Sequence, residues 1–339
     1  MRAKDTIELP EKARLLLVRL SALGDILFAL ESLAALKAER PDVRVDFLVE
    51  DRFAALLQDH PLIDELIVFP RRKRRRILGH VWHLRRKKYA AVLDLHGILK
   101  SSWQVFLARG RHKVGYAPPG SREGAYIVYN RRVELPTPLP HRAARGAFLL
   151  RELGLRHTTA RAELPITSGV PEFFADTRGA RVILHPGTST FAKFKRWPMD
   201  RFATLADRLQ ARGMAVAMSF GPGEEGLLTQ MQERTPGVIP IDGRALGLSG
   251  LAQAMRQAQV VVAADTGPLH IATAVGARVV ALFGPKDPAL YGPRGEGHRV
   301  LFHDVPCRPC RLRTCPSPQC VLGIDVDRVE ASVLELTDS

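Results

Sequence analysis

The chain has 339 residues, of which 46% are hydrophobic and 25% are charged, and its formal net charge is +15. This length exceeds one typical domain, so we expect two domains, each with enough apolar residues for a core. No apolar run is long enough to span a membrane, and the first residues do not resemble a signal peptide. These properties argue against an integral membrane protein or a secreted one and predict a cytoplasmic protein.

Much of the excess positive charge lies in two runs of Arg and Lys, at residues 71–76 and 85–88. Such a surface attracts nucleic acid, an anionic membrane or an acidic substrate, although a solvated loop has the same composition. Nucleic acid is disfavoured because no known binding module is present and aromatic residues make up only 6% of the chain.

Short apolar strands alternate with helical patterns along the chain, which predicts parallel sheets covered by helices. A proline-rich region around a helix at 142–153 interrupts this rhythm, and we place a linker near 165–180. The first half is predicted to have strands at 14–20, 43–49, 66–69 and 90–95 and a helix at 26–37. The second half is predicted to have strands at 181–185, 214–220, 238–241, 260–264 and 278–283 and helices at 199–212, 224–234, 249–257 and 268–275.

The expected fold is therefore α/β, with two doubly wound domains that face a central cleft. The predicted domains are residues 1–170 and 171–325, and a helix at 326–339 is expected to pack back on the first domain. Ligands of such folds bind at the carboxyl ends of the strands, so the loops that follow the strands are the candidate site.

The first candidate loop, RLSALGD at residues 19–25, joins the first strand to the first helix. Gly24 suits a tight turn, and Asp25 falls at the start of the helix. Asp is a favoured helix cap, and this remains an alternative. In the cleft the same carboxylate would instead take a proton from a hydroxyl group.

Three further loops follow strands of the second domain. The loop after His185 contains Thr188, and Lys195 follows it. Thr188 could donate a hydrogen bond to a phosphate group, and Lys195 could supply a positive charge to it. The loop after Phe220 contains Glu224 and Glu225, near where wound folds hold a ribose, although both also suit the first turn of a helix. The turn at Asp265, Thr266 and Gly267 precedes a helix whose free amides can bind an anion.

Taken together, these motifs resemble glycosyltransferase family 9, the heptosyltransferases of lipopolysaccharide core synthesis, and most closely the type I enzymes. The turn DTGPLH at 265–270 is the most specific of them. The resemblance also covers RLSALGD at 19–25, DLHGILKS at 94–101, SRE at 121–123, YNRR at 129–132, HRAAR at 141–145, HPG at 185–187 and KRWP at 195–198.

The resemblance implies a GT-B fold and an inverting reaction with an ADP-heptose donor, a Kdo-lipid A type acceptor and no metal. It implies that Asp25 is the general base and that Lys195 binds the donor phosphate. The remaining donor-binding residues would be Thr188, Glu224, Glu225, Asp265, Thr266, Gly267 and His270. The acceptor-binding residues would be Lys100, Arg122, His141, Arg142 and Arg145.

The resemblance further implies a monomer that works on the anionic cytoplasmic face of the inner membrane and does not bind nucleic acid. Two alternatives within the family are a type II enzyme with another acceptor and an enzyme for another sugar. A non-catalytic nucleotide-binding protein of the membrane surface is the alternative from another class.

All four cysteines lie in one stretch, as Cys307, Cys310, Cys315 and Cys320. In a cytoplasmic protein such a cluster favours a metal over disulfides. The spacing differs from a standard zinc ribbon, so a structural zinc site and four free thiols both remain open. Similar clusters occur in some type II-like relatives.

Overall fold

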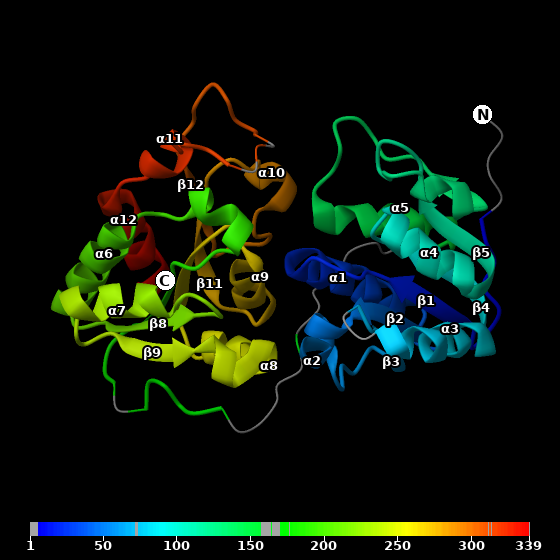
Figure 1. Cartoon of the computed structure of the whole chain (residues 1–339), viewed down its shortest axis with the longest axis horizontal. Coiled ribbons are helices and arrows are strands. Elements are labelled where there is room, and N and C mark those ends of the chain that lie inside the picture. The colour runs from blue at the N-terminus through cyan, green and yellow to red at the C-terminus, as the bar shows by residue number, and fades with distance from the viewer. Residues whose placement is uncertain are drawn as a thin grey trace. The chain divides into compact units, whose positions relative to one another are not determined.

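The computed structural model describes residues 6–71, 74–156, 164, 170–175, 177–310, 312 and 314–338. The chain divides into two compact units, Met1–Pro165 and Ile166–Ser339. Each unit contains one sheet with helices on its faces (Figure 1). The division lies five residues before the predicted domain border at 170. Part of the predicted linker, and residues 72–73 of the first basic run, lie outside the described residues.

Unit 1 is built on a parallel sheet with the strand order β3-β2-β1-β4-β5-β6. Residues 15–18 of β1 are fully buried, because helices cover both faces of this central strand. The order reverses between β1 and β4, so the loops after these two strands lie side by side at the carboxyl edge. The strands are β1 (Arg14–Val18), β2 (Arg44–Glu50), β3 (Glu65–Phe69), β4 (Lys88–Asp94), β5 (Arg109–Tyr116) and β6 (Arg131–Val133).

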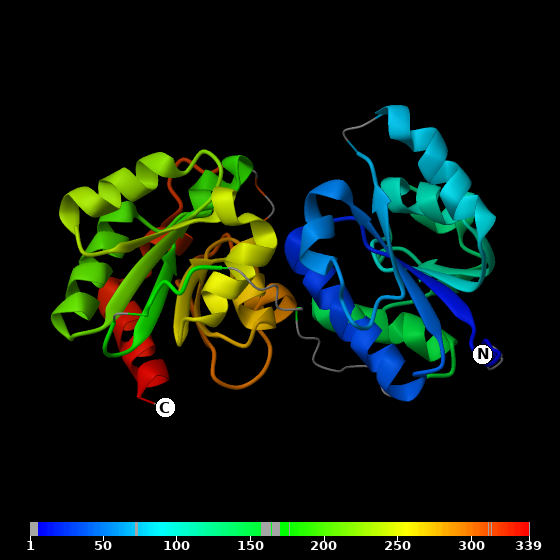
Figure 2. The same cartoon turned by 90° about the horizontal axis from the view of Figure 1, so that it is seen from below.

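The helices of unit 1 form two layers. Helices α1 and α5 contact each other, whereas α3 and α4 contact each other and the opposite face of the sheet (Figure 2). The α-helices are α1 (Leu23–Glu39), α2 (Ala54–Leu57), α3 (Ile77–Arg86), α4 (Leu99–Leu107) and α5 (Arg145–Glu152), and the 3-10 helices are η1 (Asp51–Phe53), η2 (Arg74–Arg76), η3 (Ala125–Val128) and η4 (Arg142–Ala144).

Unit 2 repeats the same winding, with the parallel strand order β12-β11-β10-β7-β8-β9. Here the order reverses between β7 and β10. Its strands are β7 (Arg181–His185), β8 (Ala215–Phe220), β9 (Ile239–Asp242), β10 (Val260–Ala264), β11 (Arg278–Phe283) and β12 (Arg299–Phe302). Its helices are η5 (Thr190–Lys195), α6 (Met199–Ala211), α7 (Glu225–Arg234), α8 (Gly243–Arg256), α9 (Gly267–Ala274), α10 (Pro288–Tyr291), α11 (Gln319–Leu322) and α12 (Val326–Thr337).

Helix α12 corrects one prediction. It packs on α6 and on strands β10 to β12, within unit 2, and not on unit 1 as expected. Val329, Val333 and Leu336, at helical spacing, are buried in the core of unit 2. This apolar stripe covers the same face of the sheet as α6, so the helix completes that layer.

The predicted strands and helices of unit 2 match the structure closely, but β12 and the short helices η5, α10 and α11 were missed. In unit 1 the prediction missed α3, α4, β5 and β6 and the short helices α2, η1, η2 and η3. Strand β5 reads RGRHKVGY, with polar residues over most of its length, and β6 has only three residues. Neither has the apolar run that marks a buried parallel strand.

Candidate active site

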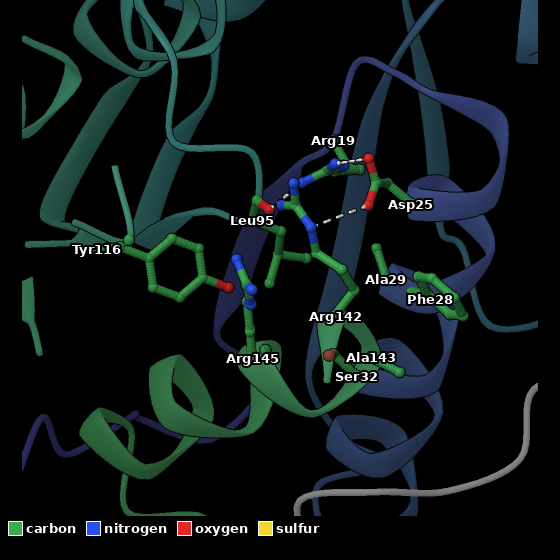
Figure 3. A pocket seen from close by; sticks show the side chains of 12 residues that line it. Arg19, Asp25, Phe28, Ala29, Ser32, Leu95, Tyr116, Arg142, Ala143 and Arg145 are labelled. Carbon is green, nitrogen blue, oxygen red and sulfur yellow. Dashed lines mark hydrogen bonds and ion pairs between the residues drawn. The ribbon is translucent and has the colours of Figure 1, made fainter. Parts of the chain in front are cut away.

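Asp25 lies in the first turn of α1, where the loop after β1 enters the helix. It does not cap the helix: the N-cap residue is Ala22, and no side chain caps this end. The carboxylate lies 2.5 Å from Nη2 of Arg19 and 3.7 Å from Nε of Arg142 (Figure 3). The helix-cap alternative is therefore wrong, because the two guanidinium groups hold the carboxylate in place of the helix amides.

The charges around Asp25 keep it ionised. Burial acts to raise the pKa of Asp25, but the charges of Arg19 and Arg142 outweigh this effect and hold the pKa below its usual 3.8. Arg19 is itself buried, which lowers its pKa, and its Nη1 donates to the carbonyl oxygen of Leu95. Asp25 is thus an anion at neutral pH, in a site with fixed positive charge.

A small pocket of about 20 Å³ opens beside this cluster. That volume holds little more than one water molecule, so the pocket is too small to hold a whole sugar. Tyr116 and Arg145 lie across the pocket from Asp25 (Figure 3). The lining residues are Arg19, Asp25, Phe28, Ala29, Ser32, Leu95, Tyr116, Gly120, Arg142, Ala143, Arg145 and Gly146.

Among the described residues of unit 1, the buried polar atoms that have no hydrogen-bond partner include Nε of Arg19, Nδ1 of His96 and Oγ of Ser121. Burial, and then the charge of Arg19, lower the pKa of His96 to about 2, so its ring is neutral. Buried polar atoms are normally satisfied, and unsatisfied ones in a native fold call for an explanation. Arg19 lines the pocket itself, and a polar ligand there offers a partner for its Nε.

The structure brings only some of the predicted acceptor residues to this pocket. Arg142 and Arg145 line it, and Nε of Arg145 donates to the carbonyl oxygen of Pro140 at 3.1 Å. His141 adjoins the pocket, because its ring packs edge-on at 5.2 Å from that of Phe28. It also accepts a bond from the amide of Ala143 at 3.2 Å and so caps η4.

Lys100 and Arg122 do not line the pocket. Lys100 pairs with the buried carboxylate of Glu50 and lies 3.4 Å from Oγ of Ser21. The side chain of Arg122 is exposed, whereas its amide donates to the carbonyl oxygen of Gly97 at 2.8 Å. Lys100, in the first turn of α4, and Arg122, in the loop after β5, therefore lie outside the lining of the pocket.

Sequence reasoning missed two buried carboxylates at strand ends. Glu50 ends β2 and also pairs with Arg52 and Arg71. Asp94 ends β4 and accepts bonds from the amides of His96 and Gly97 and from the hydroxyl of Tyr129. Both shape the loops beside the pocket, and an acidic residue at the end of an apolar strand is the signal that could have revealed them.

In unit 2, the loops after β7 and β10 meet at the reversal of strand order. Nζ of Lys195 lies 2.7 Å from Oδ2 of Asp265, and both side chains are largely buried. Thr266 is the N-cap of α9, but its hydroxyl donates to the carbonyl oxygen of Ala264 and does not cap the helix. The first amides of α9 thus remain without a side-chain cap, beside a lysine, as an anion site requires.

The two adjacent glutamates differ sharply. Glu224 is buried, accepts a bond from the amide of Gly221 at 2.8 Å and lies 3.4 Å from Nη2 of Arg196. Arg196 also donates to the hydroxyl and carbonyl oxygens of Thr188. A Cβ at Gly187 would clash with the Glu224 carboxylate, so this loop packs directly on it.

Glu225 lies apart from this network. It is exposed and pairs with Arg244. Glu224 therefore joins Thr188 in one cluster and Glu225 does not. His270, the last predicted donor residue, is buried on α9. Arg196, which connects Thr188 to Glu224, was not among the predicted site residues.

None of the four cysteines forms a disulfide; Cys307 is exposed and Cys320 is buried. The amide of Leu312 donates to Sγ of Cys310 at 3.3 Å. Over the described part of the chain, no group of three or more His, Cys, Asp or Glu is arranged to hold a metal. The zinc site stays a prediction from the spacing.

The sequence profile of glycosyltransferase family 9 (heptosyltransferase) matches residues 77–321. The chain belongs to this family. As a family 9 member it is a glycosyltransferase. It is 28% identical to lipopolysaccharide heptosyltransferase 1 of Pseudomonas aeruginosa over 89% of this chain and 87% of that protein. It is 27% identical to the enzyme of the same name from Escherichia coli K12, over 85% of this chain and 92% of that protein.

Solved structures show that this family 9 enzyme has the GT-B fold. A family 9 glycosyltransferase from Veillonella parvula superposes with a TM-score of 0.81 at 22% identity, over 98% of this chain and 99% of that one. The heptosyltransferase WaaC of E. coli with ADP superposes with a TM-score of 0.78 at 24% identity, over 95% of this chain and 99% of that one. Within the described residues, no helix has the length and apolar character to cross a bilayer.

Proposed function

We propose that this enzyme transfers L-glycero-D-manno-heptose from ADP-heptose to the Kdo of a lipid A-linked acceptor. Its similarity to two lipopolysaccharide heptosyltransferases 1 supports this choice of substrates. The single observation that carries the chemistry is the Asp25 carboxylate, which is ionised, borders the pocket and does not cap its helix.

In the proposed reaction, Asp25 accepts the proton of the acceptor hydroxyl as its oxygen attacks the anomeric carbon of the heptose. The bond from that carbon to the diphosphate oxygen breaks, and its electron pair leaves with ADP. A single displacement inverts the configuration at this carbon. Arg142 and Arg145, which line the same pocket, would hold the carboxylate of Kdo.

The leaving ADP would be held in unit 2. Lys195 and the amides at the start of α9 would meet the negative charge that develops on the diphosphate. This positive charge takes the part that a divalent cation plays in other transferases, so the proposed reaction needs no metal. Glu224 would accept bonds from the ribose hydroxyl groups, since it lies in the cluster with Thr188.

The acceptor is a membrane lipid, so the proposal places the enzyme in the cytoplasm at the inner membrane. The decisive experiment is incubation of the full chain with ADP-heptose and Kdo-lipid A, followed by mass spectrometry of the lipid. We expect one added heptose, also in the presence of EDTA. Transfer only to an acceptor that already carries a heptose would contradict the type I assignment, and transfer only from another nucleotide sugar would contradict the donor.

A further inference from the structure

The positive charge of this protein is concentrated in one part of unit 1. Residues 70–133 contain 17 Lys or Arg and only two acidic residues, so their net charge equals the +15 of the whole chain. Of the two acids, Asp94 is fully buried, and Glu123 accepts a bond from the amide of Leu99. No comparable excess remains in the rest of the sequence, which is neutral as a whole.

The same region exposes large apolar side chains. Helix α4 differs from an ordinary surface helix: besides Val105 it buries Ser101, Ser102 and Gln104, and it exposes Leu99, Trp103 and Phe106. The exposed fractions of Trp103 and Phe106 are 56% and 54%. A helix that turns its aromatic side toward solvent points to an interaction surface.

Neighbouring elements extend this apolar surface. Helix α3 contacts α4 and exposes 82% of Leu78 and 61% of Trp82, and η3, which also contacts α4, exposes 69% of Ile127. We name the resulting patch the α3–α4 face. It consists of Leu78, Trp82, Leu99, Trp103, Phe106 and Ile127.

Cations border the aromatic rings of this face. The guanidinium of Arg86 lies 4.5 Å from the ring centre of Trp82, and Nζ of Lys113 lies 5.5 Å from that of Phe106. The rings of Trp103 and Phe106 stack on each other at 5.5 Å. Exposed Trp and aliphatic side chains with Lys and Arg beside them suit the headgroup region of an anionic bilayer.

We propose that the α3–α4 face docks this enzyme on an anionic lipid membrane. Trp82, Trp103 and the aliphatic residues enter the headgroup region, while Arg85, Arg86 and Lys113 contact lipid phosphates. This proposal deepens the proposed function, because it gives the enzyme a way to reach a lipid-linked acceptor.

Two other partners fit the face less well. A single-stranded nucleic acid needs open aromatic faces for its bases, but Trp103 and Phe106 already cover each other, and Leu78, Leu99 and Ile127 offer no stacking. A second copy of the chain would bring two strongly basic surfaces together, and the repulsion would oppose the contact.

The test is partition of the full chain onto vesicles of phosphatidylethanolamine with about one third phosphatidylglycerol, compared with neutral phosphatidylcholine vesicles. We expect at least tenfold stronger partition onto the anionic vesicles, weakened by salt. In W82Q/W103Q, partition onto the anionic vesicles should fall at least tenfold. In R85Q/R86Q, it should fall roughly fivefold for each charge removed. L312Q is the matched control, because Leu312 is 64% exposed but lies outside the face.

Tryptophan fluorescence gives a readout that a folding defect does not imitate. Trp82 and Trp103 are exposed, and the third tryptophan, Trp197, is buried in unit 2. Anionic vesicles should therefore shift the emission to shorter wavelength, and lipids brominated near the headgroup should quench it. The shift should disappear in W82Q/W103Q.

Equal partition onto both vesicle types, or unchanged partition of W82Q/W103Q, would overturn the proposal. Trp-dependent binding of single-stranded RNA without vesicle binding would assign the face to nucleic acid, and a Trp-dependent dimer would assign it to self-association. Partition is measured without donor or acceptor, so failed heptose transfer leaves this result intact. In turn, the face variants should keep full activity on a water-soluble Kdo acceptor, which separates docking from catalysis.

Discussion

Both units place a buried pair of opposite charges where their strand order reverses, but the pairs differ in which member is proposed to react. In unit 1, Arg19 and Arg142 hold the carboxylate of Asp25, and the carboxylate is the proposed base. In unit 2, Asp265 holds Lys195, and the cation is the proposed phosphate ligand. In the proposed reaction, the same device of an oriented ion pair thus presents a base in unit 1 and a cation in unit 2.

The largest expected effect is on the carboxylate of unit 1. Asp25→Asn keeps the shape of the side chain but removes the proton acceptor, so turnover should fall by about 10²–10⁴-fold. ADP affinity should stay unchanged, because the nucleotide is proposed to bind unit 2. Steady-state kinetics and calorimetric titration with ADP measure the two quantities; a variant with normal turnover would exclude Asp25 as the base.

The corresponding substitution in unit 2 should change the ADP affinity, which Asp25→Asn leaves unchanged. Lys195→Ala removes the cation and should weaken ADP binding by roughly 10- to 100-fold, the range for a lost bond to a charged group. Lys193→Ala is the matched control, since Lys193 is exposed on the same 3-10 helix. If Lys195→Ala and Lys193→Ala bound ADP equally well, the result would contradict the proposed contact between Lys195 and the phosphate.

The two glutamates offer a sharper test of the donor site. Glu224→Gln should weaken ADP binding roughly tenfold, because a charged acceptor of ribose hydroxyls is replaced by a neutral one. Glu225→Gln should change it less than twofold, since Glu225 is exposed and pairs with Arg244. The same titration measures both, and the reverse order of effects would move the ribose to Glu225.

The smallest expected effect concerns pH. Arg142 lowers the pKa of Asp25, so Arg142→Gln should raise it. Protonation removes the base, and the acidic limb of the kcat profile should therefore move to higher pH in this variant. Profiles of both enzymes at saturating acceptor measure the shift; a move to lower pH would show that another group controls this limb.

The alternation of strands and helices was enough to predict the fold class and the longer elements of unit 2. Central parallel strands such as Val260–Ala264 are buried on both faces, and for this reason their sequences are continuous apolar runs that can be recognised. The polar strands β5 and β6 have no such apolar run. The position of α12 was also mispredicted, because an apolar stripe shows that a helix packs but not on which sheet.

For the candidate site, too, the sequence determined some features and the tertiary structure determined others. Sequence order alone places Asp25, Lys195 and Asp265 in loops after strands, because such loops share one edge of a parallel sheet. Only the tertiary structure decided that Arg19 and Arg142 hold Asp25, that Glu224 and not Glu225 joins Thr188, and that α4 exposes its aromatic side. These outcomes depend on contacts between residues distant in the chain, and local pattern contains no information on which of many charged side chains will meet.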